Sequence, residues 1–234
     1  MRSFSQLLQR WSRSHAAAMI AAGIGTLILE SVLPLLAGAA LMFLFLIAAR
    51  APRSQAPVLS RPNLVTALRL VCIGALVWLS AADGRGSYWL ALGATALLIS
   101  DALDGWIARK HDTATELGAL LDEEVDAFFL LALCMLSIIT ERTGWWIVVP
   151  GFLRYVFVLV RPLLERGKAP VSLRSKRARV VFVVTMVAMI TTLVPYPILY
   201  RPAAAGSSAL LLGSFLIDTW RLIRAPAASR ALNG

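Results

Sequence analysis

Four aspartates lie inside or at the edge of long apolar stretches, where ionisable side chains are rare. They are Asp101, Asp104, Asp122 and Asp126. The first two are three positions apart and the last two are four apart, so each pair shares one face of a helix. A carboxylate without a partner at membrane depth costs about 3 kcal/mol or more, so these side chains need compensation. Their spacing therefore predicts a site of chemical function.

A short polar segment separates the two pairs and predicts a turn that brings their faces together. This segment, from Arg109 to Thr115, reads RKHDTAT. Four converging carboxylates cannot all stay ionised without a cationic partner. The set contains no cysteine or histidine, and carboxylate oxygens alone suit Mg²⁺ or Mn²⁺ better than zinc. We therefore expect two divalent ions that together clamp a diphosphate.

The residues around the aspartates follow the pattern D-x2-D-G-x2-A-R-x8-G-x3-D-x3-D. This pattern resembles the signature of the CDP-alcohol phosphotransferase family, also called CDP-alcohol phosphatidyltransferases, at all eight fixed positions. The resemblance implies that the four aspartates surround the metal ions and that Asp126 is also the catalytic base. It further implies that CDP is held by Gly105, Ala108, Arg109 and Gly118. Packing between helices is the alternative role for the three small residues.

Residues 61–69, at the start of the first apolar stretch of the matching region, carry a second part of the resemblance. Residues 61–69 contain P-N-x-x-T-x-x-R, and the resemblance extends over residues 61–224. Asn63, Thr66 and Arg69 recur every three positions and lie close to one helix face, where they could bind nucleotide and phosphates. An ordinary helix cap is the alternative role for Asn63.

A separate basic set marks the expected binding site for the acceptor alcohol. Arg154 lies within an apolar stretch and needs an anion or a carboxylate partner. The other members, at the start of the following helix, are Ser172, Arg174, Lys176 and Arg179. Their donors favour a phosphorylated acceptor, such as glycerol 3-phosphate or inositol phosphate, although positive-inside topology also explains most of the charges. Only Lys176 remains of the G-K-x-K-T-x-x-Q stretch usual in phosphatidylglycerophosphate synthases, so the acceptor stays open.

The resemblance implies an enzyme of phospholipid biosynthesis. Such an enzyme moves a phosphatidyl group from CDP-diacylglycerol to a small polar alcohol and releases CMP. In the family the helical body commonly forms a homodimer, with its active site open to the cytoplasmic leaflet. Two other classes stay open. An intramembrane prenyltransferase would need a second acidic motif, which Asp218 alone does not supply, and a divalent cation transporter would have no need for Gly105, Ala108 and Arg109.

The composition excludes a water-soluble fold and indicates an all-helical integral membrane protein. Of 234 residues, 59% are hydrophobic and only 15% are charged, whereas soluble proteins have about 25% charged residues. Six apolar stretches are long enough to span about 30 Å of hydrocarbon as helices. They are residues 62–81, 88–109, 115–140, 145–163, 179–195 and 206–223. This six-helix body, residues 61–224, is the predicted catalytic domain.

The N-terminal part of the chain is predicted to add a helical hairpin. Residues 16–49 are apolar but too long for one crossing, and Glu30 and Pro34 mark a turn between two transmembrane helices. Residues 1–15 alternate basic and apolar side chains, so we expect a basic amphipathic helix on the inner leaflet, with His15 in solvent. A cytoplasmic linker, residues 50–60, and a cytoplasmic tail, residues 225–234, complete the predicted organisation.

The distribution of basic residues predicts the orientation of the chain. The net charge is +10, and 19 of the 23 lysines and arginines fall on one side of the predicted spans, against three on the other. The positive-inside rule places the larger group, and with it the active site, on the cytoplasmic face. Membrane lipids rather than nucleic acid are the expected partners of this charge. The small size and arginine-rich composition favour a bacterial inner membrane.

Overall fold

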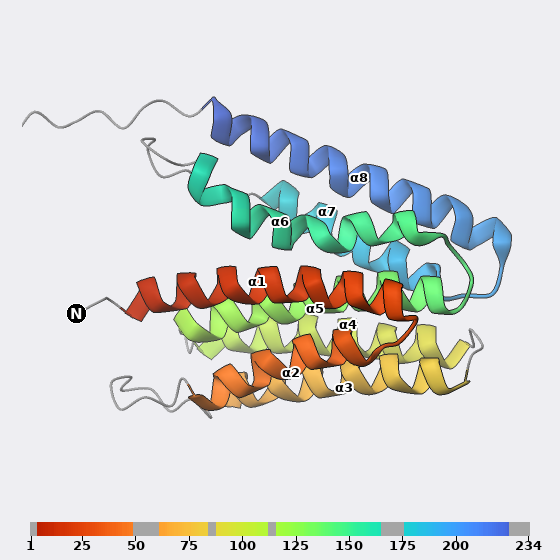
Figure 1. Cartoon of the computed structure of the whole chain (residues 1–234), viewed down its shortest axis with the longest axis horizontal. Helices are drawn as coiled ribbons and strands as arrows, with labels where there is room; N and C mark the ends of the chain where they lie inside the picture. Colours follow the sequence, from red (N-terminus) through yellow and green to blue (C-terminus); the bar gives the residue numbers. More distant parts are fainter. Residues whose placement is uncertain (1–3, 49–60, 84–87, 112–115, 165–175, 225–234) are drawn as a thin grey trace, which may run out of the picture.

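The computed structural model describes residues 4–48, 61–83, 88–111, 116–164 and 176–224, and these residues form helices and no strand. The helices are α1 Phe4–Leu29, α2 Leu33–Ala48, α3 Arg61–Asp83, α4 Tyr88–His111, α5 Glu116–Ile139, η1 Trp145–Ile147, α6 Val148–Leu164, α7 Lys176–Thr191 and α8 Pro197–Ile223. Consecutive α-helices run in opposite directions along the long axis of the molecule (Figure 1). The all-helical fold class is confirmed for this part of the chain.

The N-terminal hairpin consists of α1 and α2. Glu30 ends α1 with a φ of 48°, in the left-handed region that commonly closes helices, and α2 begins at Leu33. Residues 4–15, expected to form a separate helix on the inner leaflet, instead form the first turns of α1. The reason is burial, because Leu8 and Ser12 pack inside the bundle.

The six predicted spans correspond to α3, α4, α5, η1 with α6, α7 and α8. The first four agree at their ends within two residues, whereas α8 begins at Pro197 rather than at residue 206. Two stretches, Val65–Ala82 and Trp145–Leu164, are long and apolar enough to cross a membrane by length and composition. The predicted count of six spans is not confirmed. One reason is that the carboxylates of α4 and α5 interrupt their apolar runs.

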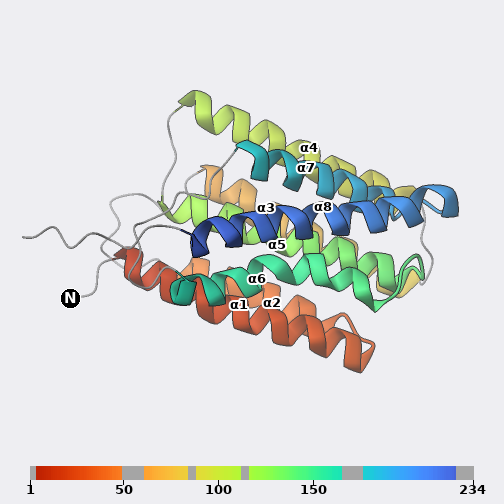
Figure 2. The ribbon, with the colours of Figure 1, turned by 90° about the horizontal axis from the view of Figure 1, so that it is seen from above.

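The centre of the bundle is α5. It packs against α1, α3, α6 and α7, and every residue from 127 to 137 is buried. This part of α5 is apolar on nearly every side, as a central helix is expected to be, whereas the N-terminal part carries the acidic residues. Figure 2 shows α4 and α7 along one side of the molecule and α1 and α2 along the other, with α5 between them. Gly151 of α6 lets the two helices approach closely, because a Cβ there would lie 3.1 Å from the Cα of Leu131.

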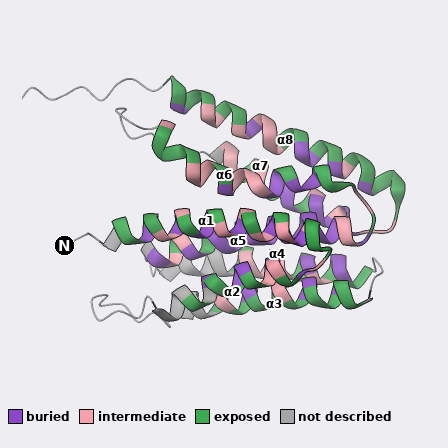
Figure 3. Ribbon diagram, in the orientation of Figure 1, coloured by how far each residue is buried: buried purple, intermediate pink, exposed green. Residues whose placement is uncertain are grey.

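The outer surface of the bundle is also apolar. Large hydrophobic side chains are exposed on most helices, including Leu92 on α4 and both Ile198 and Leu216 on α8. Figure 3 shows this pattern as exposed residues along the outer sides of α3 and α8, with buried residues on α5. A surface of this kind fits contact with lipid better than contact with water.

Candidate active site

Two neighbouring helices bring three of the four predicted aspartates together. Asp101 lies in the C-terminal half of α4, and Asp122 and Asp126 lie one turn apart in the N-terminal half of α5. One carboxylate oxygen from each lies within 4.8 Å of the other two. We call these three residues the carboxylate set. The i, i+4 spacing on α5 and the antiparallel course of α4 produce this convergence, as the sequence predicted.

A buried arginine from a third helix contacts the whole carboxylate set. The side chain of Arg69, on α3, is only 5% exposed. Its Nη2 atom donates hydrogen bonds to Oδ1 of Asp126 at 2.8 Å and to Oδ1 of Asp122 at 3.2 Å, and its Nη1 atom pairs with Asp101. One guanidinium neutralises one of three carboxylates, so the ionised set keeps a formal charge of about −2, which favours a further cation.

The carboxylate set fits the binding of a hard divalent cation. Its donors are all oxygen atoms, and they lie close enough together for one ion to contact all three. The set is also open, because 52% of the Asp122 side chain is exposed. An oxygen-only site that solvent reaches suits Mg²⁺ or Mn²⁺ together with the phosphates of a substrate.

Several predicted residues lie wholly or partly beyond what the structure describes. Ser172 and Arg174 fall outside the described residues. Others have a described helical backbone but no described side chain, and they are Asn63 in α3, Asp104, Gly105, Ala108 and Arg109 in α4, and Lys176 in α7. Gly118 lies in the first turn of α5, and Thr66 lies on α3 one turn before Arg69. The roles predicted for all these residues stay predictions.

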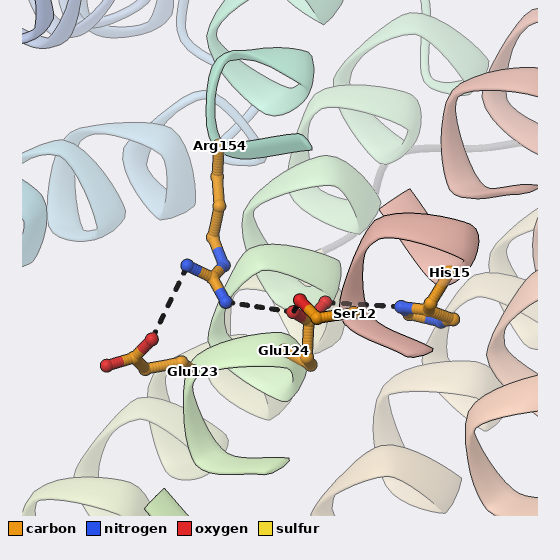
Figure 4. Close-up of polar contacts among 5 residues, drawn as sticks. All are labelled: Ser12, His15, Glu123, Glu124 and Arg154. Carbon is orange, nitrogen blue, oxygen red and sulfur yellow. Dashed lines mark hydrogen bonds and ion pairs between the residues drawn. The ribbon is translucent and has the colours of Figure 1, made fainter. Parts of the chain in front are cut away.

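The carboxylate partners of Arg154 come from the chain itself. The Nη2 atom of Arg154, on α6, donates a hydrogen bond to Oε1 of Glu124 at 2.9 Å, and its Nη1 atom lies 3.6 Å from Oε2 of Glu123 (Figure 4). Glu124 is fully buried and also binds Ser12 and His15 of α1. These five residues, drawn in Figure 4, are called the Glu124 cluster below. The expectation that His15 lies in solvent is wrong, because its side chain is 2% exposed and contacts Glu124 at 3.1 Å.

The start of α7 carries the described part of the predicted acceptor site. Arg179 is exposed in the first turn. Its neighbour Arg177 instead binds Asp218 of α8, with 2.5 Å between Nη2 and Oδ1. The basic residues at this helix start therefore differ in function, since one fixes α7 to α8 and the other is open to solvent.

The Glu124 cluster was not predicted as part of the site. Glu124 is absent from the family pattern, so the sequence left open a pairing with a basic neighbour or exposure to water, and Ser12 lies in a segment expected on the membrane surface. A usable signal was present in α5, where Glu124 lies on the face opposite Asp122 and the residues three and four positions away on its own face, Leu120, Leu121, Ala127 and Phe128, are apolar. A carboxylate in that position requires a buried partner.

Comparison with known proteins places most of this bundle in one family. A family model described as CDP-alcohol phosphatidyltransferase matches residues 59–218, which is more than half of the chain. The match includes α3 to α7, most of α8 and the whole carboxylate set, whereas α1 and α2 precede it. No solved structure matches the chain.

Similar proteins bear two kinds of name. A putative cardiolipin synthase of Mycobacterium tuberculosis is 34% identical over 120 residues, covering 50% of this chain and 52% of the relative. A CDP-diacylglycerol--glycerol-3-phosphate 3-phosphatidyltransferase of Pseudomonas fluorescens is 31% identical over 91 residues, 38% of this chain and 46% of the relative. A protein of the same name from Escherichia coli is 25% identical over 179 residues, 73% and 94% respectively. The chain thus matches about half the length of the first two relatives.

Proposed function

Because the chain belongs to the CDP-alcohol phosphatidyltransferase family, we propose that it transfers a phosphatidyl group from CDP-diacylglycerol to a small polar alcohol and releases CMP. The observation that most supports this proposal is the convergence of the carboxylate set around Arg69. A diphosphate carries enough negative charge to need divalent ions, and an open, oxygen-only carboxylate set is suited to hold them.

The proposed site contains two groups of residues, the metal ligands and the residues that bind the CDP moiety. Mg²⁺ or Mn²⁺, in one or two ions, would be held by Asp101, Asp104, Asp122 and Asp126 and would offset the charge that develops on the leaving CMP. For the CDP moiety we propose Asn63, Thr66, Arg69, Gly105, Ala108, Arg109 and Gly118. The position of the Arg69 guanidinium among these carboxylates supports its proposed role in binding the phosphates.

Asp126 is the proposed base. It takes the proton from the hydroxyl of the acceptor, whose oxygen then attacks the phosphorus of the phosphatidyl group. A bond forms between that oxygen and phosphorus, and the bond between phosphorus and the bridging oxygen breaks, so this oxygen leaves with CMP. The hydrogen bond from Arg69 at 2.8 Å orients the Asp126 carboxylate for this step. Direct transfer needs no covalent intermediate on the protein.

The proposed acceptor carries a phosphate. Arg179 is exposed at the start of α7, and Ser172, Arg174 and Lys176 precede it in the chain. Arg154 of α6 is also proposed for this site, in addition to its pairing with Glu123 and Glu124. Cationic donors of this kind favour a phosphorylated alcohol, of which glycerol 3-phosphate and inositol phosphate are the simplest examples. The names of the Pseudomonas fluorescens and Escherichia coli relatives include glycerol 3-phosphate, which supports a phosphorylated acceptor.

The protein is proposed to work in a bacterial inner membrane, with the site facing the cytoplasm. The charge asymmetry of 19 basic residues against three supports this orientation. The carboxylate set also lies toward the ends of α4 and α5 that the basic segments adjoin. A homodimer is proposed from the family alone.

The test measures CMP release by the purified full-length protein in detergent. Metal is first removed with a chelator, and CDP-diacylglycerol is then supplied with glycerol 3-phosphate, inositol phosphate, phosphatidylglycerol, free glycerol or free inositol. We expect release only when Mg²⁺ or Mn²⁺ and a phosphate-bearing alcohol are both present. Absence of CMP release under every combination would contradict the proposed function, and release with a free alcohol alone would contradict the proposed acceptor class.

A further inference from the structure

Ionisable side chains lie on two opposite faces of α5. Successive residues of an α-helix are turned by about 100°, so Glu124 points about 160° away from both Asp122 and Asp126. The two aspartates face Arg69 of α3, whereas Glu124 faces α1 and α6. Contacts made by Glu124 therefore hold α5 on the face opposite Asp122 and Asp126. The face that carries these two aspartates is called the catalytic face of α5.

Both oxygens of Glu124 have strong donors. Oε1 accepts hydrogen bonds from Ser12 Oγ at 2.7 Å and from Arg154 Nη2 at 2.9 Å, and Oε2 lies 3.1 Å from His15 Nδ1 (Figure 4). An ionised carboxylate only accepts, so Nδ1 of His15 carries the proton in this contact. Glu124 is consequently held from two directions by α1 and α6.

The α1 side of the Glu124 cluster is itself tightly held. The ring of His15 stacks on Trp11 with centroids 4.9 Å apart, and it meets Tyr155 of α6 edge to face at 6.5 Å. His15 and Tyr155 are both buried. The donors from α1 thus have little freedom to follow a displaced Glu124.

We propose that α1 positions the catalytic face of α5. Ser12 and His15 hold Glu124, and this contact fixes the rotation of α5 at which Asp122 and Asp126 meet Arg69 and Asp101. The proposal rests on the proposed function of the carboxylate set and extends it to the N-terminal hairpin, which precedes the family match. Ser12, His15 and Glu124 are positioning residues, because their described hydrogen bonds and ion pairs are with one another and with Arg154 rather than with the carboxylate set.

The geometry makes the carboxylate set sensitive to small rotations. Side-chain atoms lie about 5–6 Å from a helix axis, so a rotation of about 10° moves a carboxylate by about 1 Å. A misplacement of about 1 Å can lower turnover by about a hundredfold. We therefore expect tenfold to hundredfold effects from losing a contact on the back of α5.

The experiment compares His15→Ala, His15→Gln and Ser12→Ala with Ser137→Ala in the full-length protein. Ser137 is the matched control, because it is a buried hydroxyl on the same helix that pairs with Thr143, about 20 Å along α5 from Glu124. Three quantities are measured: the Kd for Mn²⁺ by electron paramagnetic resonance, kcat and KM for CMP release, and the melting temperature in detergent.

We expect His15→Ala to weaken Mn²⁺ binding about tenfold and to lower kcat tenfold to hundredfold, with KM for CDP-diacylglycerol within twofold. His15→Gln keeps a hydrogen-bond donor and should recover most of both losses, whereas Ser137→Ala should change neither. Combining His15→Ala with Glu124→Gln should add less than twofold to the loss in Glu124→Gln alone, because His15 acts through Glu124.

Unchanged Mn²⁺ affinity and kcat in His15→Ala, with a lower melting temperature like that of Ser137→Ala, would overturn the proposal and leave the Glu124 cluster a stabilising contact only. The Mn²⁺ measurement also separates this proposal from the proposed function. A protein that binds Mn²⁺ but releases no CMP would contradict the function, and the Mn²⁺ affinities of the variants would still decide whether α1 positions the carboxylate set.

Discussion

The carboxylate set and the Glu124 cluster both pair carboxylates with arginine, on opposite faces of α5. They differ in how many hydrogen-bond donors each carboxylate has. In the carboxylate set, one arginine is shared among three carboxylates, and the side chain of Asp122 is 52% exposed. In the Glu124 cluster, one fully buried carboxylate has three donors, from Ser12, His15 and Arg154. The carboxylate set has too little positive charge and is open to solvent, whereas the Glu124 carboxylate is fully buried and has a donor at each oxygen.

The number of donors available to each carboxylate distinguishes a binding site from a structural contact better than burial alone does. A buried carboxylate with all its donors in the chain gains nothing from a ligand, and removing one partner leaves an uncompensated charge. An open group of carboxylates with one cation gains stabilisation from a further cation. The balance of donors and acceptors therefore indicates which face of α5 meets the substrate.

The largest expected effect on CMP release comes from replacing a member of the carboxylate set. Asp122→Asn should lower CMP release by about a hundredfold to a thousandfold and remove most of its metal dependence, because one charged oxygen ligand is lost. Asp101→Asn should behave in the same way. The rate of CMP release is measured over a range of Mg²⁺ concentrations.

Glu141→Gln is the control for these two variants, since it removes an exposed carboxylate at the opposite end of α5. Both aspartate variants should be extractable in detergent as folded protein, because Arg69 keeps two carboxylate partners when one aspartate is replaced. Near-normal CMP release by either variant would refute the assignment of the carboxylate set.

Arg69→Gln tests the charge balance of the carboxylate set, with effects in opposite directions. Without the guanidinium the three carboxylates repel one another more strongly, so Mn²⁺ should bind about tenfold more tightly. CMP release should nevertheless fall, because Arg69 orients Asp126. Calorimetric titration with Mn²⁺ measures the first effect, and Arg201→Gln, an exposed arginine on α8, is the control. Weaker Mn²⁺ binding in Arg69→Gln would show that the arginine builds the site rather than competing for its charge.

The smallest expected effect concerns the acceptor. Arg179→Gln should raise KM for the phosphorylated acceptor about tenfold, which corresponds to the loss of one charge-assisted hydrogen bond of about 1.5 kcal/mol. KM for CDP-diacylglycerol should change little, because the donor phosphates are proposed to bind at the carboxylate set. Arg221→Gln removes an exposed arginine in the last turn of α8 and should leave both constants unchanged. Equal responses of the two variants would identify Arg179 as a topology signal.

The carboxylate set could be predicted from the sequence because its geometry is local. Spacings of three and four residues define a helix face, and one short polar segment between two helices brings the faces together. The hairpin was predictable for a similar reason, since the length of the apolar run and its polar interruption at Glu30 require a turn. Both inferences needed no knowledge of which helices pack side by side.

The Glu124 cluster could not be predicted in the same way because its contacts are far apart in the chain. Ser12 and His15 are 112 and 109 residues from Glu124, and no local spacing connects them. Their contact depends on α1 packing against α5 and α6, which the charge pattern of residues 1–15 obscured. Arg69 illustrates an intermediate case. Its position in the first helix of the family pattern follows from the sequence, but its pairing with three aspartates required the packing of α3 on α5.

The position of Ser12 and His15 near the N-terminus also has a consequence for biosynthesis. Glu124 is translated 30 residues before Arg154, an interval of about 2 to 6 s at about 5–20 residues per second. During that interval the carboxylate has been made and its arginine has not, whereas the serine and the histidine precede both in the chain. Because α1 precedes α5 in the chain, its serine and histidine are available to Glu124 as soon as α5 packs, so the carboxylate need not wait for the arginine of α6 to find a partner in the bundle.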